Sequence, residues 1–376
     1  MHTTRSRCRQ ERSAADSSAR RVRKQANANA DAGADAPPAV LCVHARTHAR
    51  TRTHARTRTH VYAFPARPPA RPGGQWPVLV VVPGGGFMST VRSEGTHTCR
   101  HFASRGYVCV WLHYRRYVDA VPMQAMIADV ARAVQCVRAN AAAWGLDARR
   151  VAATGYSAGA TLAATLPARD TCREALRAAA PALHDVASAQ SFVPDVLLLH
   201  YGLYDDPERH AYLLQALYEA RAREVNPDAG RWDWRLSEEA LAPRRHVRRG
   251  AWPPTLLTHG DCDRMVDVEE SRAMSRVLEI HGVPHAYVEF AEEDHGYACG
   301  TRLPLGDIVP VLGKWVDKFA DKFNSIDMFM RTDTRVYLRR TLEYLLNAVF
   351  RSGLEADCNW MDRAVAFMAE HAPAVT

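Results

Sequence analysis

Short, largely apolar runs recur along the chain, and a folded structure has to bury them. The first two are WPVLVVVP at 76–83 and YVCVWLHY at 107–114. The others are RRVAATGY at 149–156, DVLLLHY at 195–201, PTLLTHG at 254–260 and HAYVEF at 285–290, with a further short strand, VYAFP, expected at 61–65. Runs that are apolar along their length, rather than at every second residue, are typical of strands in a parallel sheet covered on both faces.

Helical patterns separate these runs. Residues 122–143 carry apolar side chains three or four positions apart, and the same spacing recurs over 268–281. A shorter helix is expected over 95–105, ended by Gly106. Strands that alternate with helices in this way predict an α/β fold, a doubly wound and mainly parallel sheet with helices on both faces. In such a sheet the chemistry lies at the carboxyl ends of the strands.

The basic charge of the chain is concentrated at its N-terminal end. The formal net charge is +8, yet residues 1–75 hold 15 Lys and Arg against 4 Asp and Glu. The remaining residues hold 34 basic against 37 acidic side chains, a net charge of −3. Nucleic acid is therefore not expected as a partner of the folded domain, because its binding depends on a basic surface.

A repetitive tract lies within this basic region. Residues 44–60 have the sequence HARTHARTRTHARTRTH, which is too polar to form a core. We therefore expect residues 1–60 to be a disordered leader, followed by one domain over 61–376. A tandem CACG repeat in DNA, taken in triplets, encodes His-Ala-Arg-Thr, so we hypothesise a translated microsatellite behind a start codon assigned too far upstream. A basic arm that contacts anionic partners is the alternative.

Cysteine usage and hydropathy bear on the cellular compartment. The nine cysteines are scattered without a CxxC pair, so we expect neither a disulfide framework nor a zinc or other metal site, and favour the reducing cytoplasm. The Arg- and Ser-rich start leaves mitochondrial import as an alternative. No apolar run reaches the roughly 20 residues of a membrane span, so no membrane association is expected.

A glycine-spaced serine stands where the third run meets the next helix. Residues 155–159, GYSAG, fit the pattern G-x-S-x-G, and small residues follow them. Glycines two positions on either side of Ser157 allow a sharp turn that lifts the hydroxyl clear of the sheet. The alternative is a small-residue strand that continues into a small-residue helix without any chemistry. The surrounding strand and helix patterns favour Ser157 as a nucleophile.

A serine nucleophile needs a base, and the base needs an acid to orient it. The loop after the fifth run offers Asp261, Asp263 and Asp267, and the loop after the sixth run offers His295. The order serine, acid, histidine along the chain is the one that this kind of fold requires. We predict that His295 is the general base and Asp263 the acid, with Asp261 as the main competitor.

Three other histidines are weaker candidates for the base. His259 lies inside the end of a predicted strand, while His281 and His285 flank a turn at the opposite edge of the sheet. Since the chemistry is expected at the carboxyl ends of the strands, none of the three stands in the right loop.

Charge stabilisation is expected from a glycine loop after the first run. The segment PGGGF, residues 83–87, lacks the Gly-Lys-Ser/Thr continuation of a phosphate-binding loop. We predict an oxyanion hole formed by the amides of Gly85, Gly86 and Ala158.

Aromatic and thioether side chains lie next to these loops. Phe87, Met88, Tyr156 and Tyr201 are candidates for the acyl pocket, with an ordinary role in the core as the alternative.

These motifs together resemble those of a known family. VVVPGGGF, the Tyr114-Arg115 pair, Trp144-Gly145 and GYSAG occur in the order found in the acetyl-xylan-esterase-like branch of the α/β-hydrolases. The resemblance extends from about Val61 to Gly296. It implies an α/β-hydrolase fold, a triad of Ser157, Asp263 and His295, an oxyanion loop at Gly84–Gly86, and cleavage of acetyl or other short-chain esters, often of carbohydrates, without a cofactor.

Two segments depart from the family pattern. Residues 203–250 carry additional helical and aromatic material, which is either a lid or a packed surface helix pair. Residues 301–357 resemble a helical insertion before the last helix. Two alternative functions follow. The first is an amide hydrolase like the kynurenine formamidases, which share the glycine loop and the serine motif. The second is a non-catalytic α/β-hydrolase relative that acts as a binding module.

The hypothesis about the leader predicts the composition of the native protein. If translation starts downstream of the repeat, mass spectrometry of the protein isolated from its source should detect no peptide from residues 1–58. Peptides from the folded domain provide the internal control. Detection of leader peptides at comparable abundance would contradict the upstream-start hypothesis.

Overall fold

The computed structural model describes residues 60–64, 75–88, 90, 92–119, 121–179, 189–205, 242–299 and 360–371. Almost all of the predicted leader lies outside the described residues, as do the predicted insertion at 301–357 and residues 206–241 of the proposed lid segment. Among the described residues, none of the helices combines the length and the apolar composition that a membrane crossing requires.

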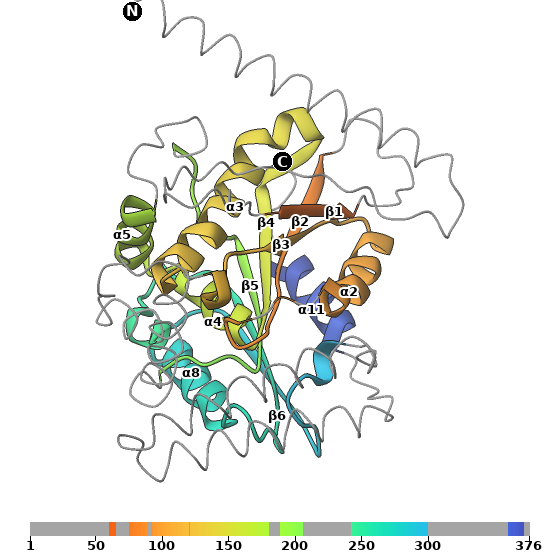
Figure 1. Cartoon of the computed structure of the whole chain (residues 1–376). Helices are drawn as coiled ribbons and strands as arrows, with labels where there is room; N and C mark the ends of the chain where they lie inside the picture. The colour runs from red at the N-terminus through yellow and green to blue at the C-terminus, as the bar shows by residue number, and fades with distance from the viewer. Residues whose placement is uncertain are drawn as a thin grey trace, which may run out of the picture.

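A seven-stranded sheet forms the centre of the molecule (Figure 1). Its strands are β1 (His60–Phe64), β2 (Trp76–Val82), β3 (Val108–His113), β4 (Leu146–Tyr156), β5 (Val196–His200), β6 (Thr255–Gly260) and β7 (His285–Phe290). Their order across the sheet is β1-β3-β2-β4-β5-β6-β7. Neighbours from β3 to β7 are parallel, whereas β1 pairs with β3 in antiparallel register. The predicted mainly parallel sheet is confirmed.

The apolar runs form these strands because helices cover both faces of the sheet. In β2, Val78, Val80 and Val82 face one apolar cluster, while Leu79 and Val81 face the other. All five are fully buried. Alternate side chains of a strand point to opposite faces, so a strand covered on both sides must be apolar at every position. This requirement explains the absence of polar alternation in the sequence.

The helices divide between the two faces (Figure 1). On one face lie α3 (Met123–Trp144), α4 (Ala158–Thr165), α5 (Arg169–Ala179) and α8 (Glu269–Ile280). The opposite face is covered by α2 (Arg92–Ser104) and α11 (Trp360–His371). Short 3₁₀ turns are η1 (Tyr117–Asp119), η3 (Pro243–His246) and η4 (Tyr297–Cys299).

The predicted helices are present with small shifts at their ends. The helix expected over 95–105 begins three residues earlier, and the third predicted strand begins at Leu146 rather than Arg149. Helix α3 stops where Gly145 adopts a left-handed conformation, with φ of 70°, and donates its amide to the last turn. Helix α5 was not predicted. It packs against α3.

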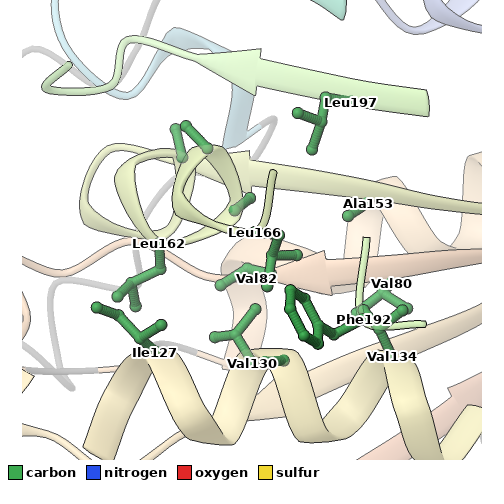
Figure 2. Close-up of a cluster of buried hydrophobic side chains, with 14 of the residues drawn as sticks. Val80, Val82, Ile127, Val130, Val134, Ala153, Leu162, Leu166, Phe192 and Leu197 are labelled. Atoms are coloured by element: carbon green, nitrogen blue, oxygen red, sulfur yellow. The ribbon is translucent and has the colours of Figure 1, made fainter. Parts of the chain in front are cut away.

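The apolar cluster beneath β2 and β4 joins the sheet to α3 and α4 (Figure 2). Strand side chains meet helical side chains there, and the labelled members are Val80, Val82, Ile127, Val130, Val134, Ala153, Leu162, Leu166, Phe192 and Leu197. Because β4 leads directly into α4, this packing also fixes the turn between them.

Burial in this cluster predicts the cost of truncating one of its side chains. Ile127→Ala should lower the free energy of unfolding by about 2–5 kcal/mol, because it removes a fully buried side chain and leaves a cavity. Urea denaturation measures this difference. Ile280→Ala is the matched control, since Ile280 is also helical but 79% exposed, and its effect should be small. Equal effects of the two substitutions would contradict this assignment of the core.

Candidate active site

Ser157 occupies a strained turn between β4 and α4. Its φ is 51° and its ψ is −122°, a backbone conformation that residues other than glycine rarely adopt. A Cβ atom on Gly155 would collide with the backbone of Gly159, and one on Gly159 would collide with the carbonyl of Val82. The two glycines of the motif therefore let strand, turn and helix approach one another. The amide of Ser157 is held by the carbonyl of His200, at 2.9 Å.

The Ser157 hydroxyl begins a row of hydrogen bonds. Its Oγ lies 2.9 Å from Nε2 of His295, and Nδ1 of His295 lies 2.7 Å from Oδ2 of Asp263. The three residues follow β4, β7 and β6, so the topology brings them to the same edge of the sheet. With Nδ1–H donated to the carboxylate, Nε2 is left to accept the serine proton.

Asp263 is a buried carboxylate with four donors. Its Oδ1 accepts the amides of Met265 and Val266, at 2.8 and 2.9 Å. Its Oδ2 accepts from His295 and also from Nε2 of His259, at 3.1 Å. Burial by itself would raise the pKa of Asp263, but the charge of His295 and the hydrogen bonds from both histidines hold that pKa well below its ordinary value. The group is therefore ionised at neutral pH.

The two other aspartates of this loop have different partners. Oδ1 of Asp261 accepts the amide of Glu292, at 2.7 Å, and Oδ1 of Asp267 accepts the amide of Glu269, at 2.9 Å. The structure thus places Asp263, rather than its competitor Asp261, against the histidine.

The loops that carry Asp263 and His295 are tied together beside the row. Arg264 Nε donates to Oδ2 of Asp294 over 2.7 Å, and Nη2 of the same guanidinium reaches that oxygen as well. Oδ1 of Asp294 accepts the amide of His295, at 2.7 Å. The amide of Cys262 donates to the carbonyl of Glu293, at 3.0 Å. The bonds of Arg264 and Cys262 link residues about 30 positions apart, and with the contact of Asp294 to the His295 amide they set the position of the imidazole relative to the carboxylate.

The glycine loop after β2 lies directly over the serine turn. A Cβ atom on Gly84 would stand 2.9 Å from the carbonyl oxygen of Tyr156 and 3.2 Å from Cβ of Ser157. Gly85 and Gly86 have φ of 118° and 59°, in the region that favours glycine. Ala158 opens α4, and the helix itself offers its amide no acceptor. The predicted donors Gly85, Gly86 and Ala158 thus belong to two segments that meet at Ser157.

A tyrosine and a tight turn hold this loop in place. The Tyr114 hydroxyl donates to the carbonyl of Pro83, at 3.0 Å, from a fully buried position. The amide of Met88 donates to the carbonyl of Gly85, at 2.9 Å, which closes the turn. Beside Tyr114, Arg115 forms a buried ion pair with Asp129 of α3, at 2.8 Å.

The four candidates for the acyl pocket occupy different environments. Tyr156 is fully buried, and its hydroxyl bonds to Thr98 over 2.6 Å on the face covered by α2 and α11. Tyr201 is buried with its ring centroid 4.7 Å from that of His295, so it contacts the predicted base. Phe87 is buried, whereas Met88 is partly exposed. Tyr156 therefore belongs to the core. Met88 lies nearest to solvent, and Tyr201 lies nearest to the imidazole of His295.

A buried histidine that was not singled out from the sequence, His200, ends β5 as the register partner of Tyr156. His200 is fully buried, with Nε2 3.0 Å from Oγ1 of Thr154 and Nδ1 2.8 Å from Oγ1 of Thr258. Its ring stacks on Tyr156 and lies 4.2 Å from the ring of Trp360. Burial lowers the pKa of His200 to about 3. Part of the signal was present in the sequence, because His200 ends an apolar run and a buried histidine is favoured in its neutral form.

The chain is similar to one protein family and to several known proteins. The BD-FAE family model matches residues 67–278, more than half of the chain. Esterase LipQ of Mycobacterium tuberculosis is 31% identical over 245 residues, which cover 63% of this chain and 54% of LipQ. Endo-1,4-beta-xylanase B of Butyrivibrio fibrisolvens is 25% identical over 221 residues, 58% of this chain and 32% of that protein. The chain spans about half the length of LipQ, and less of the xylanase.

Solved structures are similar in fold. An esterase from Thermogutta terrifontis aligns with a TM-score of 0.51 and 24% identity, over 70% of this chain and 90% of its own. The acetyl ester-xyloside bifunctional hydrolase from Caldicellulosiruptor lactoaceticus aligns with a TM-score of 0.54 and 23% identity, over 76% and 96%. Together with the topology of the sheet, these likenesses confirm the predicted α/β-hydrolase fold.

The environment of His200 predicts how stability depends on pH. The folded protein resists protonation of His200 until about pH 3, whereas an unfolded histidine binds a proton near its ordinary pKa of 6.5. This contribution to stability is complete above pH 6.5 and is lost as the pH falls through 6.5 towards 3, by about 1.4 kcal/mol per pH unit. His200→Gln should therefore flatten the dependence of unfolding free energy on pH between 6 and 4.

Denaturant unfolding at several pH values measures this slope. The control is His97→Gln, because His97 is exposed and should leave the slope unchanged. A slope in His200→Gln equal to that of the wild type would contradict the assignment of a buried neutral imidazole.

Proposed function

Because the chain belongs to the BD-FAE family, we propose that it is a serine hydrolase that cleaves short-chain carboxylic esters of the acetyl type. The row formed by Ser157, His295 and Asp263, with separations of 2.9 and 2.7 Å, is the observation that supports this activity most directly. The likeness to proteins named as esterases, LipQ among them, supports the same chemistry.

The first half of the reaction forms an acyl-enzyme. Nε2 of His295 takes the proton of Ser157 as Oγ attacks the acyl carbon of the ester. The resulting imidazolium is stabilised by the ionised carboxylate of Asp263. The tetrahedral intermediate then collapses, the bond to the alcohol oxygen breaks, and His295 returns the proton to the departing alcohol.

The negative charge develops on the former carbonyl oxygen of the tetrahedral intermediate, and backbone amides stabilise it by donating hydrogen bonds. Gly85 and Gly86 in the loop after β2 and Ala158 at the start of α4 are the proposed donors. The close approach of Gly84 to the serine turn supports this role, because it places the loop beside the side chain of Ser157. Each such donor can contribute about 3 kcal/mol to transition-state stabilisation.

Water completes the cycle. His295 takes a proton from a water molecule, which attacks the acyl carbon of the acyl-enzyme. Collapse of the second tetrahedral intermediate releases the carboxylic acid, and His295 gives the proton back to Oγ of Ser157. The enzyme is thus regenerated in its starting protonation state.

Carbohydrate esters are the proposed natural substrates. Two proteins that this chain resembles are named for xylan or xyloside chemistry, the xylanase of Butyrivibrio fibrisolvens and the bifunctional hydrolase of Caldicellulosiruptor lactoaceticus. An acetyl group on a sugar hydroxyl is a small acyl chain on a polar alcohol, which fits cleavage of short-chain esters.

Substitution of the serine tests the proposed function. The wild type should hydrolyse p-nitrophenyl acetate, and Ser157→Ala should lower kcat by about four orders of magnitude or more, because it removes the proposed nucleophile. A fluorophosphonate probe should label the wild type and leave Ser157→Ala unlabelled. Ser104→Ala, at an exposed serine, is the matched control and should keep both rate and label.

Comparison of substrates then defines the class. Acetylated xylo-oligosaccharides should be cleaved, and aryl acetate should be turned over faster than formyl-kynurenine. Failure of the folded wild type to react with the fluorophosphonate would overturn the proposal, and faster turnover of formyl-kynurenine would reassign the enzyme to amide hydrolysis.

A further inference from the structure

Asp263 has two histidine partners, and the proposed mechanism uses one of them. The second is His259, the penultimate residue of β6, whose Nε2 lies 3.1 Å from the same Oδ2 that accepts from His295. Both side chains of this second pair are completely buried. His259 was a competing candidate for the base, whereas the structure places it against the acid and places His295 against Ser157.

The surroundings of His259 require a hydrogen on Nε2. This nitrogen lies between two acceptors, Oδ2 of Asp263 and the carbonyl oxygen of Val266, each at 3.1 Å. The other nitrogen, Nδ1, lies 2.7 Å from Oγ of Ser271 on α8, a buried hydroxyl that can donate to it. Since two oxygens without hydrogens can only accept, Nε2 is a donor whichever way Ser271 points.

We propose that His259 is a positioning residue that tunes how strongly Asp263 holds the protonated His295, and thereby sets the pH at which the base becomes available. The inference rests on the proposed function, because His295 must act as the base. His259 does not touch the substrate, and it acts through the shared oxygen of Asp263.

The direction of this effect follows from charge. A carboxylate oxygen that accepts a hydrogen bond from His259 has less electron density to offer to His295, so the imidazolium is held less firmly. Removal of the Nε2 donor would strengthen the bond between Asp263 and His295 and raise the pKa of His295. A cationic His259 would act in the same direction, since its loss would also remove repulsion of the imidazolium.

Other charged groups around His259 have donors of their own. Glu289 on β7 is the register partner of His259 and is held by Arg272 and the Tyr287 hydroxyl, each at 2.6 Å. On α8, Glu270 accepts the amide of Tyr204, at 2.6 Å.

The remaining neighbours leave the sign of the effect unchanged. In the adjoining loops, Asp294 is paired with Arg264, and Asp267 caps its own turn. In the segment after β5, Tyr201 contributes a ring against His295, and burial raises the pKa of Tyr204, which therefore stays neutral. The donors that remain on Asp263, the amides of Met265 and Val266, are unaffected by substitution of His259.

Two amide substitutions that differ by one methylene separate the donor from the packing. In His259→Gln, the side-chain amide reaches the position of Nε2 and can still donate to Asp263. In His259→Asn it ends near the position of Nδ1 and can reach only Ser271. His259→Phe removes the donor while it keeps a ring, and it provides the comparison with His259→Gln if His259→Asn does not fold.

The pKa of His295 is the readout. It is measured by titration of the ¹⁵N-histidine signals in the substrate-free protein and by the acid limb of kcat/KM with p-nitrophenyl acetate. His259→Asn and His259→Phe should raise this pKa by about half a unit or more, because one donor to the acid is lost. His259→Gln should stay close to the wild type. An unchanged pKa of His295 in folded His259→Asn or His259→Phe would overturn the inference.

Ser271→Ala is the control for a merely structural role. It removes the partner of Nδ1 but leaves both acceptors at Nε2, so the melting temperature should fall while the pKa of His295 stays unchanged. A shift of that pKa in Ser271→Ala as large as the shift in His259→Asn would assign the effect to packing and overturn the inference.

The titration also distinguishes this inference from the proposed function. Because the ¹⁵N signals are read without substrate, a wild type that is inactive and unlabelled would refute the hydrolase, whatever the histidine titration gives. An active wild type whose His295 does not respond to His259 would refute only the positioning role.

Discussion

One buried carboxylate organises this site. Asp263 carries its charge in a position with no side-chain exposure, and it remains ionised only because four hydrogen-bond donors surround it. An isolated charge in such a place would be too costly to keep. The fold therefore has to supply the donors, two from the backbone of the same loop and two from histidines on neighbouring segments. The imidazole that faces Ser157 is one of these donors, so the electrostatic need of the acid and the orientation of the base are met by the same bond.

Much of the fold could be predicted because the apolar runs and helical spacings are local signals. Six of the strands were expected from largely apolar runs, and β1 from a short extended segment. The pairing direction of β1 could not be predicted, because register depends on its neighbour β3. Helix α5 was missed because it is half as long as α3 and rich in charged residues, and α3 itself supplies the surface against which it packs.

The site was predictable to the extent that its residues lie in loops after strands. Ser157 and His295 follow from this rule, whereas the choice of Asp263 over Asp261 depends on which carboxylate meets the imidazole of His295 rather than the amide of Glu292. The tie between Arg264 and Asp294 could not be found, since it depends on the pairing of β6 with β7. The tie between His259 and Asp263 depends on how the loop after β6 turns back on the end of that strand. The place of Tyr156 in the core could have been predicted from the sequence. Tyr156 shares a face of β4 with Ala152, and that face lies under α2 and α11.

The turn at Ser157 has a cost that the rest of the molecule must carry. A residue with a side chain in this conformation is disfavoured by about 1–3 kcal/mol, and glycine would be free of that penalty. Selection for stability alone would thus favour glycine at this position, whereas a requirement for the hydroxyl favours serine. A strained serine at this turn therefore indicates a functional requirement, because the surrounding backbone holds a residue that lowers the stability of the fold.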